Sequence, residues 1–348
     1  MSKHGPVISA SAARTLKVRE MFEAARTLKV REMFEAARTF EVRDNDEEER
    51  SLINMVEVEE IELLILRRMR EVTIGDHRSL SHGTGFDYIG LRDWQAGDRF
   101  SNIDWPQSTL TNFSPLVVRE FEQPSTATVM VVADESLSTR CGAQGVTIAR
   151  LVARAIATIG LSAVFFQDMF GLATFDDAGR HLAAIPPRIG RNQVMHCLDA
   201  YQNHRGLEEV KDTGSLSMTI GSFMRKTALI PFVSDFLFTE PRAVLDELSL
   251  LNATHDVFIV LIDAAFAFEV PHVSAGWVET VDVETGRTRM MSRAALTGMA
   301  DRVRVWQDDV ARAAREVAVD VVRFDSESVA NHLALAEFVA ERRLRKVA

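Results

Sequence analysis

Three oxygen-bearing side chains stand at alternate positions where a strongly apolar stretch ends. Residues 127–134 read ATVMVVAD, and Asp134 is followed at alternate positions by Ser136 and Ser138. Alternate side chains of an extended loop face the same side, so these three can converge on one point. Mg²⁺ prefers hard oxygen ligands in an octahedron and keeps some of its waters, which hydroxyl and carboxylate groups allow. The alternative is that Asp134 or Ser136 caps the helix expected near residue 146.

Carboxylates also end two later apolar stretches. Ser234 and Asp235 close ALIPFVSDF (228–236), and Asp263 closes HDVFIVLID (255–263). In an open parallel sheet the carboxyl ends of the strands share one edge, and ligands bind there near the reversal of strand order. Serine hydroxyls would be direct ligands, and the aspartates would hold metal-bound waters. The predicted site, for Mg²⁺ or Mn²⁺, consists of Asp134, Ser136, Ser138 and Asp235.

Strand and helix patterns alternate along the chain from residue 127 onward. Apolar runs of strand length are separated by stretches with helical periodicity. The predicted strands are 127–134, 169–177, 180–187, 228–236, 255–263 and 319–324, and the predicted helices are 146–162, 192–204, 240–251, 299–318 and 329–346. This alternation predicts an α/β fold with a doubly wound, mostly parallel sheet.

The N-terminal part of the chain contains a tandem repeat. AARTLKVREMFE (12–23) recurs without change at 24–35 and begins again at residue 36. Its apolar stripe turns by about 120° from one unit to the next, so a continuous helix has no single buried face. The repeat is either a duplication without a specific role or a helical arm for a partner.

The chain is predicted to have three parts. Residues 1–50 form an arm that is helical or poorly ordered. Residues 51–124 combine a helix at 51–69 with a small β-rich extension. Residues 125–348 form the main domain, with a hairpin insertion at about 270–292, where the sequence alternates around a turn.

Charge and composition exclude several function classes. The net charge of -10 leaves no basic excess to neutralise nucleic-acid phosphates. Two cysteines, Cys141 and Cys197, are too few for a disulfide framework and lack metal-ligand spacing. The longest apolar stretch, 155–166, is shorter than the roughly 20 residues of a bilayer-spanning helix. We therefore expect a cytoplasmic protein with no membrane span and no nucleic-acid partner.

Two segments resemble known families. The DESLS loop followed by a helix, with VSD on a later strand, is similar to the metal-ion-dependent adhesion site of von Willebrand factor type A domains. Residues 91–123 resemble the signature of the bacterial family called Domain of Unknown Function 58, which precedes a type A-like domain. The matching positions are Arg92, Trp94, Gly97, Asp98, Ile103, Asp104, Trp105, Val118, Arg119 and Glu120. The resemblance covers about residues 52–348 and implies a von Willebrand factor type A-like fold.

The chain departs from the type A ligand set at one position. Type A domains usually add a metal-binding threonine from a later loop, and the equivalent stretch, RIGRNQVMH (188–196), has none. Asn192 is a possible additional ligand through its side-chain carbonyl, although Arg191 beside it would repel a cation. The resemblance therefore implies an incomplete ligand set, with lower metal affinity or no metal requirement.

The charged residues of the signature permit two interpretations. Opposite charges lie close together in a short stretch, at Arg92, Asp98, Asp104 and Arg119. One interpretation is a buried, fully paired Asp–Arg network that fastens the extension to the sheet, with Trp94 and Trp105 packed over it. The other is direct contact with a partner protein.

Two function classes follow from the candidate site. The resemblance implies a metal-assisted protein-binding module whose Mg²⁺ takes a carboxylate from a partner. Because the resembled family often accompanies MoxR-type AAA+ ATPases, the implied role is adaptor or co-chaperone for such an ATPase and its client, in protein assembly or remodelling. The alternative is a Mg²⁺-dependent phosphohydrolase with Asp134 as nucleophile. That chemistry usually needs a carboxylate two residues later, where this chain has Ser136, a poor proton donor.

Overall fold

The computed structural model describes most of the chain from Ser51 to Val347. The described residues are 51–76, 87–95, 100, 103–122, 126–143, 145–176, 180–211, 213–224, 226–269, 277–281, 288–325 and 328–347. The predicted arm at 1–50, with its repeat, and Asp98 of the signature lie outside the described residues.

Among the described residues, seven strands form a mostly parallel central sheet. They are β3 (Thr128–Asp134), β6 (Met169–Asp176), β7 (Arg180–Ile189), β8 (Glu208–Glu209), β9 (Leu229–Ser234), β10 (Asp256–Ile262) and β13 (Asp320–Phe324). The strand order is β13-β10-β9-β3-β6-β7-β8, and β7 runs antiparallel to both of its neighbours. Every residue of β3 is buried, as a central strand covered on both faces requires. The predicted α/β architecture with a mostly parallel sheet is confirmed.

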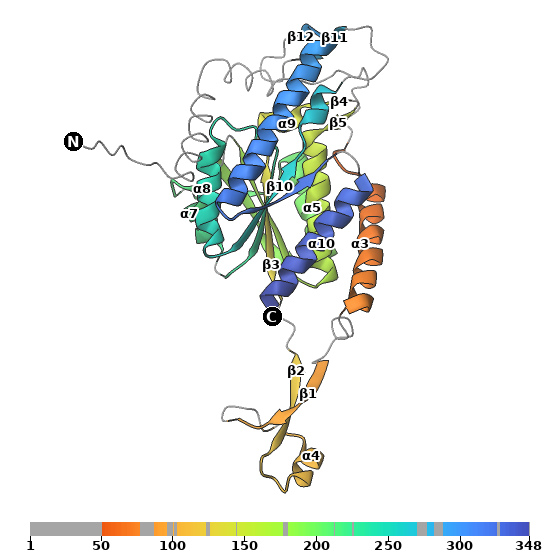
Figure 1. The fold of residues 1–348 in the computed structure, drawn as a ribbon, viewed down its shortest axis with the longest axis vertical. Helices are drawn as coiled ribbons and strands as arrows, with labels where there is room; N and C mark the ends of the chain where they lie inside the picture. The colour runs from red at the N-terminus through yellow and green to blue at the C-terminus, as the bar shows by residue number, and fades with distance from the viewer. Residues whose placement is uncertain are drawn as a thin grey trace, which may run out of the picture.

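Helices cover both faces of this sheet. They are α3 (Met55–Asp76), α5 (Ile148–Phe165), α6 (Arg191–Asn203), α7 (Leu216–Phe223), α8 (Pro241–Asn252), α9 (Arg293–Glu316) and α10 (Ser328–Val347). Figure 1 shows α3, α5 and α10 on one side of the sheet and α7 and α8 on the other. The described part of the protein has two hydrophobic cores, a first that includes residues of α5 and a second that includes residues of α8. Val303 of α9 belongs to the first core and Val310 of α9 belongs to the second. The helix α9 therefore joins the two layers.

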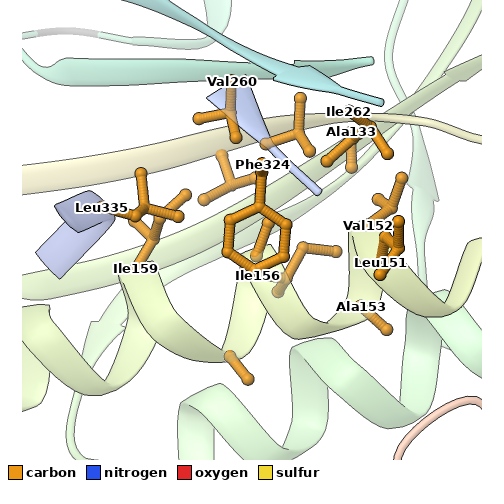
Figure 2. Close-up of a cluster of buried hydrophobic side chains, with 14 of the residues drawn as sticks. Ala133, Leu151, Val152, Ala153, Ile156, Ile159, Val260, Ile262, Phe324 and Leu335 are labelled. Atoms are coloured by element: carbon orange, nitrogen blue, oxygen red, sulfur yellow. The ribbon is translucent and has the colours of Figure 1, made fainter. Parts of the chain in front are cut away.

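The helix α5 is at the centre of the first core. Figure 2 shows Ile156 and Ile159 directed toward the sheet, where Val260 and Phe324 lie. Among the described residues, α5 is the one helix that is long and apolar enough to cross a membrane, and 72% of that window is buried inside the protein. A buried core helix passes the same test, so this is weak support for a membrane span.

The N-terminal helix α3 packs on the main domain. Its fully buried side chains recur at helical spacing and belong to the same core as α5 and α10; they are Val58, Ile61, Ile65 and Met69. The helix predicted at 51–69 is therefore present, and it continues to Asp76. It belongs to the main domain by packing, whereas the sequence grouped it with the β-rich extension.

Ion pairs tie α3 to three neighbouring helices. The pairs are Glu57 with Arg150 and Arg154 of α5, Glu62 with Arg191 of α6, and Arg68 with Glu337 of α10. The side chains of Glu57 and Arg154 are only 13% and 15% exposed. Removing one partner of such a pair leaves the other charge poorly solvated, so this contact fixes where α3 docks.

The β-rich extension is a hairpin-like pair of strands with a short helix between them. β1 (Asp87–Asp93) and β2 (Val117–Glu122) are antiparallel, and α4 (Trp105–Leu110) lies between them in sequence. The sequence predicted short strands here but not α4. This helix begins where the Asp104 side chain accepts a hydrogen bond from the Gln107 amide, with proline in the first turn. Figure 1 shows the extension standing apart from the central sheet.

Two further antiparallel pairs are short. β11 (Trp277–Val281) and β12 (Thr288–Ser292) form the predicted hairpin directly before α9. β4 (Gly142–Ala143) and β5 (Val146–Thr147) pair just before α5. The Thr147 hydroxyl caps α5 by accepting a hydrogen bond from the Arg150 amide at 3.1 Å. The N-terminus of this helix is therefore capped without Asp134 or Ser136.

Candidate functional site

The predicted site lies where the strand order reverses. β3 has β6 on one side and β9 on the other, and all three run parallel. Ala133 of β3 is opposite Val233 of β9, so Asp134 and Ser234 come next at the same sheet edge. The structure thus brings the two predicted strand ends together at the position where open α/β sheets bind ligands.

Hydrogen bonds hold Asp134 in a single orientation. Its Oδ1 accepts from the Ser136 amide at 2.9 Å, and its Oδ2 accepts from the Ser234 hydroxyl at 2.6 Å. The backbone carbonyl of Asp134 accepts from the Tyr201 hydroxyl at 2.8 Å. Asp134 is 0% exposed, so it acts on the loop through these bonds and not by direct contact with solvent.

Tyr201 is held as a hydrogen-bond donor by its surroundings. Burial raises the pKa of its phenol well above the ordinary value, and the negative charges of Asp134 and Asp235 raise it further. A phenol that stays protonated keeps donating to the Asp134 carbonyl at any physiological pH. Tyr201 therefore links the last turn of α6 permanently to the end of β3.

The two serine hydroxyls of the loop lie side by side. Ser136 Oγ and Ser138 Oγ form a hydrogen bond of 3.0 Å, in which either hydroxyl can donate. Neighbouring ligands of an octahedral Mg²⁺ at 2.0–2.1 Å are separated by about 3 Å, so the spacing suits two adjacent positions of such an ion. Ser136 begins the 3₁₀ helix η2 (Leu137–Arg140) but its side chain makes no capping hydrogen bond. The capping interpretation of the loop is therefore not supported.

Asp235 is fixed from two directions. Its Oδ1 accepts from the Leu237 amide at 2.9 Å, and its backbone carbonyl accepts from Gln307 Nε2 at 2.9 Å. The same Gln307 nitrogen donates to the Ile262 carbonyl at 2.7 Å, so α9 ties the ends of β9 and β10 together. Asp235 is 0% exposed. Like Asp134, it is placed to orient neighbouring groups.

Asp263 directly follows β10 at the same sheet edge. Its Oδ1 accepts from the Ala265 amide at 2.8 Å. Burial raises the pKa of this carboxyl, against the lowering effect of the hydrogen bond from Ala265. The three strand-end carboxylates expected from the sequence are thus all at one edge, with Asp263 one strand further out than Asp235.

The donor set fits one class of metal. Among the described residues, no group of three or more His, Cys, Asp and Glu side chains is placed to hold an ion, which argues against zinc and similar metals. Two adjacent hydroxyls with oriented carboxylates behind them are the hard oxygen groups that Mg²⁺ and Mn²⁺ prefer. Ser136 is half-buried, so an ion can reach its hydroxyl from the solvent.

Asn192 is not part of this site. β7 returns antiparallel along β6, so that Ile189 lies opposite Met169 at the amino end of the parallel strands. Asn192, at the start of α6, follows at that opposite sheet edge and is exposed. Arg191 beside it is paired with Glu62 of α3 at 2.9 Å. The prediction that Asn192 is an additional metal ligand is therefore wrong. It failed because the direction of β7 could not be inferred from the sequence.

The signature residues lie in the extension, away from the strand-end loop (Figure 1). Asp104 caps α4 through the Gln107 amide at 3.1 Å, and Arg92 donates to the Asp93 carbonyl at 3.1 Å. Arg119 lies on β2 opposite Leu91. Trp105 is 55% exposed, which contradicts the expectation that it packs over a buried network.

The described residues offer few groups for covalent catalysis. Both cysteines are buried, and burial raises the pKa of the Cys197 thiol to about 12, so it is unreactive at neutral pH. His332 is buried far along the chain from the loop, and its ring Nδ1 lies 2.6 Å from the Thr158 hydroxyl.

Sequence reasoning missed two residues of the site and the cap of α5. Tyr201 and Gln307 come from helices whose position relative to the loop depends on strand order, for which the sequence carries no local signal. Thr147 was detectable, since threonine directly before a helical pattern is a common cap.

Residues 90–316 match the family described as "Protein of unknown function DUF58". No curated protein is a significant match to the chain. One similar solved structure is an aerotolerance-related membrane protein from Bacteroides fragilis NCTC 9343 with multiple mutations to serines, at 13% identity, a TM-score of 0.36 and coverage of 62% of this chain and 99% of that chain. Another is the conserved hypothetical protein BatB from Bacteroides thetaiotaomicron, at 13% identity, a TM-score of 0.34 and coverage of 62% and 99%. The pilus adhesin SpaC from Lactobacillus rhamnosus GG, in its open conformation, gives 11% identity, a TM-score of 0.35 and coverage of 65% and 31%.

Proposed function

The chain belongs to the DUF58 family, and we propose that it is a protein-binding module whose strand-end loop holds Mg²⁺ or Mn²⁺. The ion would sit on the hydroxyls of Ser136 and Ser138. Asp134 and Asp235, both buried, would hold the loop and the strand end in place behind it. When bound, it would supply a positive charge and a coordination position for a carboxylate of the partner.

One observation carries the proposal. The hydroxyls of Ser136 and Ser138 lie 3.0 Å apart beside a buried carboxylate that the structure holds in one orientation. The two hydroxyls are hydrogen-bonded to each other, and the same spacing suits two adjacent ligands of a Mg²⁺ ion. The similarity of this loop to the adhesion site of von Willebrand factor type A domains supports the same reading, and we extend the proposal to a type A-like fold.

The proposed partner is a MoxR-type AAA+ ATPase together with its client, in the cytoplasm. This part rests on the resemblance of the family and on no contact in the structure. An adaptor or co-chaperone needs a docking site that can be switched, and an ion that reverses the local charge supplies one. Without the ion, the acidic groups at the edge, among them Glu135 and Asp263, would keep a partner carboxylate away from the hydroxyls of the loop.

The alternative, a Mg²⁺-dependent phosphohydrolase, is less well supported. Asp134 would have to attack phosphorus in line, but it is 0% exposed and both of its oxygens already accept hydrogen bonds. The position of the general acid is occupied by Ser136, whose hydroxyl does not titrate near neutral pH. Binding is therefore the function that the geometry favours.

The test is a calorimetric titration of the full chain with MgCl₂ and with MnCl₂. Ser136→Ala and Ser138→Ala should weaken metal binding at least about tenfold, because each removes a direct ligand. Ser222→Ala is the matched control, since Ser222 is an exposed serine on α7, on the other face of the sheet. Equal affinity in wild type, both loop variants and the control would mean that the loop binds no metal.

A further inference from the structure

A pocket of about 380 Å³ lies directly beside the candidate metal loop. Its wall comes from the loop after β3, the start of α5, the last turn of α6 and the first described residues of the chain. Its lining includes Ser51, Glu135, Thr139, Arg140, Tyr201 and His204. The volume is near the lower end for pockets that bind small ligands, so it suits one or two side chains of a peptide.

The pocket and the loop share hydrogen-bonded residues. Tyr201 donates to the Asp134 carbonyl at 2.8 Å, and the Thr139 hydroxyl donates to the Ser136 carbonyl at 2.7 Å. Thr139 and Tyr201 are only 4% and 2% exposed, so these two bonds form a rigid wall between pocket and loop. A ligand in the pocket would therefore lie against the loop, on the side where Ser136 meets solvent.

Charge at the pocket points to an anionic ligand. Arg140 is exposed and makes no ion pair with any described residue. Glu135, the acidic residue of the wall, contacts the His204 imidazole on the α6 side of the pocket. An arginine that keeps its guanidinium available binds carboxylates well, because two parallel N–H groups match the two carboxylate oxygens.

We propose that this pocket binds an acidic side chain of a partner peptide through Arg140, independently of the metal. The proposal deepens the proposed function, because the same peptide would present a second carboxylate to the loop. The partner's recognition segment would then carry at least two acidic residues close together. The net charge of -10 repels such a peptide from the rest of the surface, so binding requires the positive charge of Arg140.

The experiment measures fluorescence anisotropy of a labelled hexaglutamate peptide with the full-length chain in EDTA. Wild type should bind it, and a hexaglutamine peptide should not bind. Arg140→Gln should weaken hexaglutamate binding about tenfold, the loss expected for one charge-assisted contact. Arg188→Gln, at an exposed arginine on β7 near the opposite sheet edge, should bind like wild type.

Two outcomes would overturn the assignment. Equal affinity of the two arginine variants for hexaglutamate would show that Arg140 makes no specific contact with the peptide. Failure of wild type to bind hexaglutamate would show that the pocket does not bind acidic side chains. Because EDTA is present throughout, the result is separate from the metal titration: peptide binding that depends on Arg140 stands even if the loop binds no ion.

The acidic residues just before Ser51 offer the same chemistry within the chain. A full-length variant with Glu47, Glu48 and Glu49 changed to Gln distinguishes the two sources. Unchanged hexaglutamate affinity supports a partner peptide as the ligand. A gain of tenfold or more would overturn that choice and assign the pocket to the chain's own acidic run.

Discussion

Replacing Gly160 by alanine should destabilise the protein, although alanine is the better helix former. Gly160 lies inside α5, where the exchange alone would stabilise the helix by about 0.8–1.0 kcal/mol. A Cβ there would stand 2.7 Å from Val194 Cγ1 and 3.0 Å from Phe170 Cζ. Both neighbours are 0% exposed, so neither has open space to move into.

The crowding should exceed the gain in helix propensity. Overpacking a well-filled core costs about 1–3 kcal/mol, and a contact at 2.7 Å, closer than real Cβ atoms approach, belongs in the upper part of that range. The free energy of unfolding should therefore fall by about 1–2 kcal/mol in Gly160→Ala. The cause would be separation of α5 from α6 and β6.

Gly298→Ala in α9 is the matched control. The nearest atom to its added Cβ is the flexible end of Arg302, at 3.5 Å, so only the propensity gain of about 1 kcal/mol should remain. Urea unfolding followed by circular dichroism should thus move the two midpoints in opposite directions from wild type. A midpoint for Gly160→Ala at or above that of Gly298→Ala would refute the claim that α5 and α6 are in tight contact.

Two further predictions concern pH and the repeat. Burial lowers the pKa of His332 from 6.5 to about 4, and the positive charge of Arg154 lowers it further. The neutral His332 therefore contributes to the stability of the fold above pH 6.5. As the pH falls from 6.5 toward 4, this contribution of about 3 kcal/mol is lost. His332→Gln should therefore lose less stability than wild type between pH 7 and pH 4, as measured by urea unfolding, and an identical loss would contradict this. Deleting residues 12–35 should leave the melting temperature within about 4 °C of wild type, and a larger drop would show that the repeat packs on the core.

Local patterns predicted most of the main domain. The apolar run at 127–134 became β3, and the helical period at 192–204 became α6, each within a residue or two of its bounds. Such elements are encoded by the period of their apolar residues. The short helix α7 was missed, because its eight residues, LSMTIGSF, do not span enough turns to show a period.

The site could be predicted only as far as strand direction allowed. Asp134, Ser136, Ser138 and Asp235 follow buried runs, so a parallel sheet was enough to bring them to one edge. Asn192 depended on the direction of β7, which pairs antiparallel with β6 and reverses the edge at which α6 begins. Tyr201, at the other end of α6, reached the loop for the same reason.

The attachment of α3 determines how the protein would respond to mechanical force. Tension on the chain before Ser51 reaches α3 first, because α3 precedes every strand of the central sheet in the sequence. Its links to the main domain are side-chain contacts, such as Glu57 with Arg154, and not backbone pairing with a strand. A pulling force on this part of the chain would therefore detach α3 before it unfolded the sheet. The sheet would stay folded, with the spacing of Ser136 and Ser138 unchanged, while the apolar surface under α3 became exposed.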